Sequence, residues 1–225
     1  MVKDPAYKEM IRAQQKATMG LSYGSLFEYL QAAGQDVEPL SELLVERMMS
    51  QMDLGMDMMD TSLSPTEKEK KQKAIADINT QYDQQIRDLL GPENFPIFQQ
   101  YEQTQPERMQ VNMFKPSLKG TDQLSEEQEH QLILSLYTER TNFYSTAGGY
   151  QMNQNVDVIF SEEAISKQMA DRKALQARYA ECARKVLQPA QFEQFKKSQE
   201  QQQAMEEMAM RMSLQMFGAT NQATP

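Results

Sequence analysis

Methionine is the residue type that gives this sequence most scope for chemistry, because it occurs 18 times in 225 residues. Many of these methionines recur at intervals of three and four residues, and residues with that spacing share one face of an α-helix. One such stripe consists of Met48, Met52, Met56 and Met59. A second stripe, near the C-terminus, consists of Met205, Met208, Met212 and Met216. The sequence thus predicts two helical faces covered with thioethers.

Three roles are compatible with such stripes. Methionine fills irregular gaps in cores and between helices, and the same flexibility suits surfaces that bind varied partners. Thioethers are also soft ligands that select Cu(I), although no histidine or cysteine joins either stripe. The C-terminal helix has few other large apolar residues, chiefly Leu214 and Phe217, too few for a tightly specified core. We therefore expect part of its methionine stripe to be incompletely buried.

The residue types most used in catalysis are nearly absent, since the chain has one histidine, His130, and one cysteine, Cys182. His130 lies among glutamates and glutamines, where a solvated side chain is expected, and a metal site needs more ligands. Cys182 falls on an apolar helical stripe, which predicts a buried, unreactive thiol. The sequence contains no glycine-rich phosphate loop, nucleophile elbow or calcium loop. We predict no catalytic, cofactor-binding or metal-binding residue, and a protein that is not an enzyme.

Charge and hydropathy limit the partners. The formal net charge is −9, and basic residues are interspersed with acidic ones, so the surface should repel nucleic acid. No segment approaches the roughly 20 apolar residues that span a bilayer. Residues 1–10 contain no apolar signal core. The protein is then either cytoplasmic or a periplasmic protein whose signal peptide has been removed.

Capping residues and prolines indicate where helices begin. Ser64, Pro65 and Glu67 form a capping box with proline at the first helical position, and Ser125 with Gln128 forms another box. Good helix formers dominate the composition, and no segment alternates convincingly as a strand does. The predicted fold class is therefore all-α, an elongated bundle or cradle of about seven helices. We expect them near residues 5–33, 36–61, 64–90, 92–114, 125–142, 161–187 and 189–216.

Two segments 97 residues apart share the phrase Arg-x-(Leu/Val)-Leu-x-Pro-x-x-Phe-x-x-Phe, which begins at Arg87 and at Arg184. A leucine ends one helix, a proline opens the next, and two phenylalanines should pack back on the first helix. The motif residues are Leu90, Pro92, Phe95 and Phe98 in one copy and Leu187, Pro189, Phe192 and Phe195 in the other. Leu43–Arg47 also matches Leu136–Arg140. We interpret these matches as a tandem duplication, with convergent helical-hairpin chemistry as the alternative.

The repeat divides the chain into predicted regions. Residues 1–35 form an N-terminal helix, and residues 218–225 form a disordered tail. Between them lie the first helical repeat at 36–115, a linker at 116–124 and the second repeat at 125–217. The second repeat contains a long loop at 143–160, which is rich in glycine and asparagine.

The repeated phrases resemble the LTxxQ signature of the Spy/CpxP family of periplasmic helical proteins. Leu124–Gln128 fits the signature with serine in place of threonine. Leu187–Phe192 is similar to the family's Leu-Thr-Pro-x-Gln-aromatic form, with glutamine in place of threonine. Leu90–Phe95 is a further copy, with glycine in place of threonine and asparagine in place of glutamine. A family unit has one motif near its second helix and one opening its last, an order found here twice.

Members of that family act as ATP-independent chaperones or as sensors of envelope and metal stress, several as cradle-shaped homodimers. The resemblance implies a periplasmic, single-chain pseudo-dimer that binds protein clients or a second copy, with the methionine stripes as candidate contact surfaces. The chain departs from the family in its length, its acidity and its missing motif threonines. Two alternatives stay open: a cytosolic structural or adaptor protein that docks partner helices, and a methionine-rich copper-handling protein.

Overall fold

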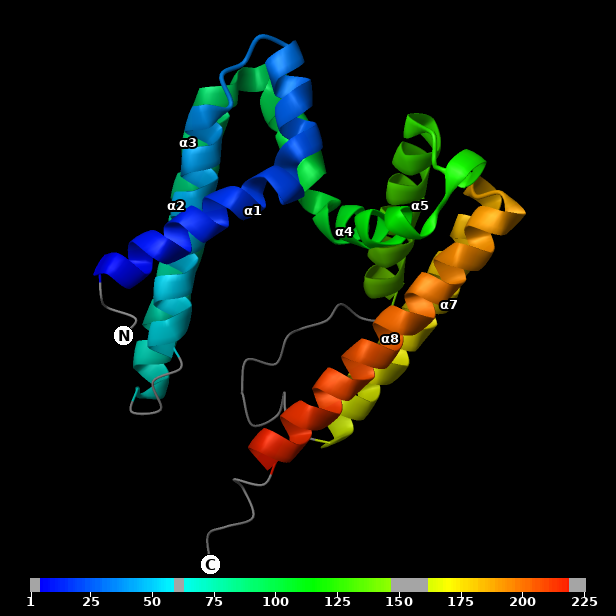
Figure 1. Ribbon diagram of the computed structural model, residues 1–225. Coiled ribbons are helices and arrows are strands. Elements are labelled where there is room, and N and C mark those ends of the chain that lie inside the picture. The colour runs from blue at the N-terminus through cyan, green and yellow to red at the C-terminus, as the bar shows by residue number, and fades with distance from the viewer. Residues whose placement is uncertain (1–4, 59–62, 147–161, 219–225) are drawn as a thin grey trace, which may run out of the picture. The chain divides into compact units, whose positions relative to one another are not determined.

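The computed structural model describes residues 5–58, 63–146 and 162–218. Across these residues the backbone forms seven α-helices and two short 3-10 helices, with no strand (Figure 1). The all-α prediction is confirmed. No helix within the described residues is both long and apolar enough to cross a membrane.

The chain divides into two compact units, Met1–Gln103 and Thr104–Pro225. The first unit contains α1 (Pro5–Ala32), α2 (Glu38–Met58) and α3 (Pro65–Gln103). α2 packs along α3, and α1 contacts both helices. The ribbon of α1 is bent along its length, so that its two halves run in different directions (Figure 1).

α3 consists of two helical segments joined at a kink. Gly91 has a φ of 71°, a backbone conformation that glycine adopts without the steric cost that a Cβ would impose. Pro92 follows and opens the second segment, where its missing N–H leaves no hydrogen bond unmade. The predicted helix at 64–90 therefore ends, and the next helix begins, at the predicted place.

A single apolar cluster holds the first unit together, drawn from the second half of α1, the first half of α2 and both segments of α3. Its buried members are Met19, Tyr23, Leu26, Leu30, Leu40, Leu44, Val45, Ile86, Leu90, Phe95, Phe98 and Tyr101. The rings of Phe95 and Phe98 stack with their centroids 6.2 Å apart. The kink thus allows both segments of α3 to contribute to one core.

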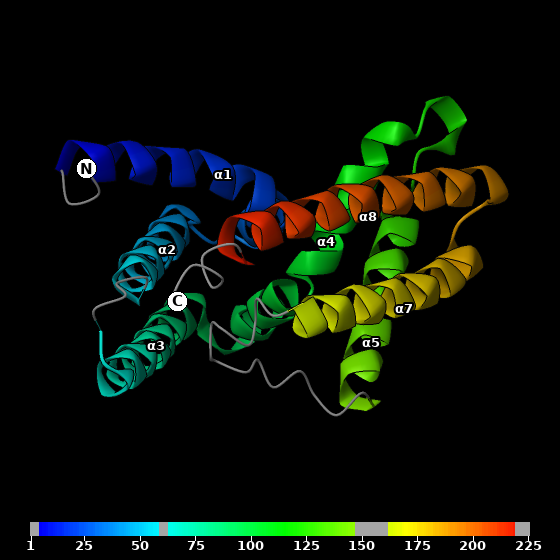
Figure 2. The same cartoon turned by 90° about the horizontal axis from the view of Figure 1, so that it is seen from below.

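The second unit contains four α-helices and two 3-10 turns. They are α4 (Gln105–Phe114), η1 (Lys115–Ser117), η2 (Gly120–Asp122), α5 (Glu126–Thr146), α7 (Glu162–Val186) and α8 (Pro189–Gly218). α7 contacts α5 and α8, and α4 contacts the same two helices. Both views show α7 and α8 running side by side (Figures 1 and 2).

The core of the second unit is built in the same manner. Its buried members are Val111, Phe114, Leu118, Leu132, Ile133, Leu136, Phe143, Leu175, Tyr179, Cys182, Ala183, Leu187, Phe192 and Phe195. Phe114 meets Phe195 edge-on at a centroid distance of 5.3 Å. The expectation that all four repeated phenylalanines are buried is confirmed, since none is more than 6% exposed.

The predicted capping boxes are formed. The backbone N–H of Ser64 donates to Glu67 Oε2 at 2.8 Å, and that of Glu67 donates back to Ser64 Oγ at 3.4 Å. Ser125 and Gln128 make the same reciprocal pair, with both distances 3.2 Å. These bonds satisfy N–H groups that the first turn of a helix leaves without partners, so the start of each helix is encoded locally.

The structure corrects the predicted helix at 92–114, which is divided at Thr104. Pro106 lacks an N–H and therefore cannot continue the hydrogen-bonded ladder of α3. Residues 104–115 pack with the second unit, where Val111 and Phe114 are fully buried. The division between the two compact units thus lies before the predicted 116–124 linker, and α1 is an integral part of the first core.

Two predicted irregular segments are shorter than expected where the structure describes them. α5 continues to Thr146, because Phe143 is buried in the core and holds the last turn of the helix. Residues 147–160 of the predicted loop lie outside the described residues. Gly218 is the last residue of α8, and the remainder of the predicted tail also lies outside them.

Equivalent side chains of the repeated phrase make equivalent contacts. The Arg87 guanidinium lies 4.4 Å from the ring centroid of Phe95, and that of Arg184 lies 4.8 Å from the ring centroid of Phe192. The turn between the helices differs, because a glycine makes it in the first copy and Gln188 occupies that position in the second. The duplication stays a prediction, and superposition of the two helix pairs is its test.

Candidate functional site

Three methionines of the predicted C-terminal stripe are exposed on α8. Met205, Met208 and Met212 are 59%, 65% and 52% exposed. The prediction of incomplete burial is confirmed for these three residues, and the side chain of Met216 lies outside the described part of the chain. We call Met205, Met208 and Met212 the methionine face.

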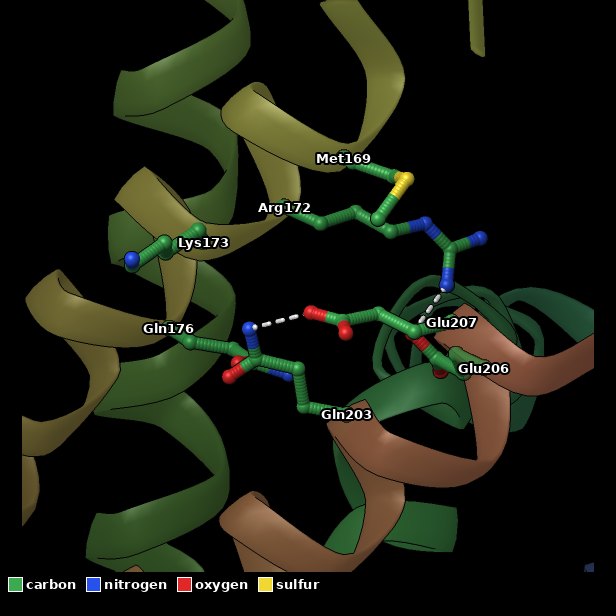
Figure 3. Close-up of a pocket in the computed structure, with 7 residues that line it drawn as sticks. All are labelled: Met169, Arg172, Lys173, Gln176, Gln203, Glu206 and Glu207. Atoms are coloured by element: carbon green, nitrogen blue, oxygen red, sulfur yellow. Dashed lines mark hydrogen bonds and ion pairs between the residues drawn. The ribbon is translucent and has the colours of Figure 1, made fainter. Parts of the chain in front are cut away.

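Beside the methionine face, the side of α8 that faces α7 is polar. Gln202, Gln203, Glu206 and Glu207 are half-buried. Figure 3 shows polar side chains from both helices meeting in the gap, where the guanidinium of Arg172 pairs with the carboxylate of Glu206. Gln203 Nε2 donates to Glu207 Oε1 at 3.1 Å. The space left between them is about 10 Å³, close to the volume that one water requires.

Helix geometry explains why the methionines are exposed while polar residues face α7. Phe195 and Gln199 mark the buried side of α8. At about 100° per residue, the methionine face is centred about 120° around the helix from that side. No described residue of α7 before Leu175, or of α8 after Gln199, is buried. We call residues 163–174 together with 200–212 the hairpin arm. Met169 lines the gap between α7 and α8 together with polar residues of both helices (Figure 3), whereas Met205, Met208 and Met212 are exposed on the other side of α8.

The methionines of α2 behave differently. Met48, Met52 and Met56 are half-buried, and Met48 packs against the core of the first unit. Met59 lies outside the described residues. This stripe therefore serves at least partly as packing between helices, which is the first of the three roles considered for methionine.

Ion pairs join the first half of α1 to α2. Lys8 Nζ lies 2.6 Å from Asp53 Oδ2, Arg12 Nη2 lies 2.7 Å from Glu42 Oε2, and Lys16 Nζ lies 2.5 Å from Glu42 Oε1. Hydrogen bonds from Lys16 and Arg12 lower the pKa of Glu42. No described residue in this half of α1 is buried, so charge rather than an apolar core holds it in place.

The second unit also contains a recess of about 200 Å³, lined by residues of all four of its α-helices. Gln110 of α4, Tyr144 of α5 and Gln176 of α7 contribute to its walls. Glu107 of α4 and Tyr179 of α7 line it as well. The lining mixes aromatic, amide and charged groups. Glu107 and Tyr179 belong to a buried ionic cluster.

Glu107 is the centre of that cluster and is 1% exposed. Arg140 Nε donates to Glu107 Oε1 at 2.5 Å and Arg140 Nη2 donates to Glu107 Oε2 at 3.1 Å, while the Tyr179 hydroxyl donates to Oε1 at 3.2 Å. Burial, and then the charge of Glu107, raises the pKa of Tyr179. The carboxylate is thus paired and hydrogen-bonded, as a buried charge requires. We call Glu107, Arg140 and Tyr179 the Glu107 cluster.

The first unit has a cluster of the same three residue types. Arg47 Nη2 donates to Glu102 Oε2 at 2.7 Å, and the Tyr23 hydroxyl donates to Glu102 Oε1. Burial, followed by the charge of Glu102, raises the pKa of Tyr23. Arg47 and Arg140 also occupy matched positions in the repeat. An arrangement that recurs in both units favours a role in fixing helix packing over a role in catalysis.

The two residues singled out for their chemistry lie apart from these features. Cys182 is 8% exposed within the core of the second unit, and burial raises the pKa of its thiol to about 11. The predicted burial of Cys182 is therefore confirmed. A thiol held protonated is a poor nucleophile and metal ligand, in line with the unreactive role expected for it. His130 is exposed on α5. Among the described residues, no three His, Cys, Asp or Glu side chains are grouped so as to hold a metal ion.

Sequence reasoning overlooked other exposed apolar residues and the ionic clusters. Met109 and Met113 of α4 are 61% and 51% exposed, and their spacing of four was the available signal. The burial of Glu107 had no such signal, because a lone glutamate on a helix is ordinarily solvated. Arg140 was visible only as part of the match between Leu43–Arg47 and Leu136–Arg140.

Comparison with known proteins adds no assignment. No protein-family model matches the chain, and no curated protein or solved structure matches it. The resemblance to the Spy/CpxP family therefore rests on the motif residues alone.

Proposed function

We propose that the chain is a non-enzymatic, chaperone-like protein-binding module whose methionine face binds apolar segments of client proteins. The observation that supports this most directly is the placement of three methionines, each more than half exposed, on one side of the hairpin arm. Burial of apolar surface contributes about 25 cal/mol per Å². Methionine side chains adapt to partners of different shape, which suits a surface that must bind more than one client.

The charge of the chain defines the client class. The chain carries a net charge of −9, and Glu200 is an exposed acidic residue of the same hairpin arm. An acidic surface increases the rate of encounter with basic partners. We expect the preferred client segment to combine apolar side chains with lysine or arginine, and we expect acidic apolar segments to bind more weakly.

The periplasm is the compartment this proposal favours, because the family that Leu124–Gln128 and Leu187–Phe192 resemble is periplasmic. A cytosolic adaptor is the alternative. The two differ in selectivity, since an adaptor binds one folded helix whereas a chaperone-like module suppresses aggregation of unrelated unfolding proteins. Envelope fractionation of cells that produce the protein tests the compartment separately from the binding activity.

The binding proposal is tested by replacing Met205, Met208 and Met212 with Gln. The replacements keep helix propensity similar while removing the apolar surface, so circular dichroism should be unchanged. The variant should lose suppression of aggregation, measured by light scattering of an unfolding substrate protein. Its self-association, measured by analytical ultracentrifugation, reports whether a second copy uses the same face.

A matched control replaces exposed apolar residues elsewhere, namely Met10 and Leu21 of α1, with Gln. These are 57% and 82% exposed, so the control removes comparable apolar surface from the first unit. It should retain both activities. Equal loss in the two variants would show that exposed apolar area in general, and not the methionine face, causes the effect. Full activity of the triple variant would contradict the proposal.

A further inference from the structure

We infer that the methionine face is also a binding site for a soft monovalent metal ion of the Cu(I) and Ag(I) class. Met205, Met208 and Met212 place three thioethers on one side of α8. Thioether sulfur is a soft ligand that selects Cu(I) over hard cations such as Mg²⁺ and Ca²⁺. The inference is independent of client binding, because it depends on the sulfur atoms and not on the apolar area.

The backbone geometry of α8 places Met208 within reach of both other methionines. At about 100° per residue, Met205, Met208 and Met212 fall within an arc of about 60°. Along the helix axis Met208 lies about 4.5 Å from Met205 and about 6 Å from Met212. Methionine has three rotatable side-chain bonds, so the sulfur of Met208 can share one ion with the sulfur of either neighbour. Met205 and Met212, about 10.5 Å apart along the axis, are too far apart to share one ion directly.

The ion pair that joins the two helices of the arm, Arg172–Glu206, does not involve these three side chains. It lies on the other side of α8, as does the hydrogen bond from Gln203 to Glu207 within that helix. Each methionine is more than half exposed. A metal ion therefore reaches the thioethers without displacing core residues, and the net charge of −9 favours a cation at the surface.

The single cysteine is the main competing ligand and is excluded by position. Cys182 lies in the core of the second unit, with its thiol pKa raised to about 11 by burial. All measurements are nevertheless made in a Cys182→Ala background, so that no thiolate contributes. In that protein we expect Ag(I) to shift the methyl resonances of the three methionines. We also expect Cu(I), held reduced without oxygen, to be withdrawn from its coloured complex with bicinchoninate.

The decisive variant changes Met205, Met208 and Met212 to Leu, which removes the sulfur and keeps the side chain apolar and close in volume. Its affinity for Cu(I) should fall by about tenfold or more. The matched control changes Met109 and Met113 of α4 to Leu, and its affinity should stay within about twofold of the parent. Circular dichroism checks that each variant is helical.

The same variants separate this inference from the proposed function. The leucine variant should lose Cu(I) binding and keep suppression of aggregation, whereas the corresponding Gln variant should lose both. Failure of the parent protein to compete with bicinchoninate would overturn the metal site. So would unchanged affinity in the triple leucine variant, or a loss carried by Met109 and Met113 instead.

Discussion

Breaking the Glu107 cluster should destabilise the second unit. Arg140→Leu leaves a carboxylate that is 1% exposed without its counter-ion. Removing one partner of a buried ion pair costs about 3–5 kcal/mol. The Tyr179 hydroxyl still donates a hydrogen bond to Glu107, and the Arg140 side chain is 28% exposed. We therefore expect a loss near the lower limit, about 3 kcal/mol.

The double variant Arg140→Leu with Glu107→Gln removes both charges and should recover most of that loss. Replacement of a buried pair by groups without charge is often close to neutral, because neither ion then has to leave water. The difference between the single and double variants measures how much of the effect is an unpaired buried charge. A structural role for the cluster predicts a difference of about 2 kcal/mol or more.

Cys182 supplies an assay that is specific for the second unit. It is the single cysteine in the sequence and is buried in that unit's core, so its alkylation in increasing denaturant reports when the core opens. Circular dichroism reports both units at once. Arg140→Leu should lower the denaturant concentration at which Cys182 reacts. Arg47→Leu, which breaks the matching cluster of the first unit, should change the circular dichroism curve but not the alkylation midpoint.

Two results would refute this reasoning. If the double variant is as unstable as Arg140→Leu, the damage comes from lost packing and not from an unpaired carboxylate. If Arg47→Leu shifts the alkylation of Cys182 as much as Arg140→Leu does, the two compact units do not unfold independently.

Four further outcomes are expected. Phe98→Ala and Phe195→Ala should each cost about 3–5 kcal/mol, because both rings are buried, and an unchanged thermal midpoint would show that they are not packing devices. Raising the ionic strength from about 0.1 M to about 1 M should speed amide hydrogen exchange in the first half of α1, since screening weakens its ion pairs with α2. Glu42→Gln should speed the same exchange at low salt. Equal exchange rates in all cases would show that these ion pairs do not hold the first half of α1 in place. The folded pKa of Cys182 lies above that of the unfolded thiol, so the stability it confers is complete below pH 9 and is lost as the pH rises toward about 11; Cys182→Ala should flatten that decline in a pH series of unfolding curves. His130→Gln combined with Cys182→Ala should preserve the helical spectrum and any activity found, and loss of an activity without unfolding would reverse the non-enzymatic proposal.

Local chemistry accounts for the features of the fold that the sequence predicted well. Ser64 with Glu67, and Ser125 with Gln128, satisfy N–H groups within one turn, so each helix start depends on neighbouring residues alone. The kink at Gly91 likewise needs only a glycine followed by a proline. Each of these features involves residues that are adjacent in the chain, and none requires knowledge of the tertiary contacts.

The remaining features depend on contacts between distant residues. Glu107 is buried because Arg140, 33 residues away, and Tyr179, 72 residues away, converge on it. No property of Glu107 or its neighbours distinguishes it from a solvated glutamate. The division at Thr104 is a different case, since Pro106 was a visible signal for a new helix. The predicted single helix at 92–114 was wrong because this signal was not used, and the rule that proline cannot continue a helix would have placed the break.

The two methionine stripes show that phase, and not spacing alone, affects which methionines are exposed. At about 100° per residue, Met48 and Met52 lie within about 50° of the centre of the buried face of α2, and both are half-buried. On α8, Met205 lies about 100° from the centre of the buried face that contains Phe195, and it is exposed. Gln202 and Glu206 occupy the positions that face α7. The buried residues Leu44 and Phe195 are apolar anchors that the sequence itself displays. Met56, about 90° from the centre of the buried face of α2, is nevertheless half-buried, so the angle alone does not separate packing methionines from surface methionines. The binding proposals rest on α8 because Met205, Met208 and Met212 are exposed there.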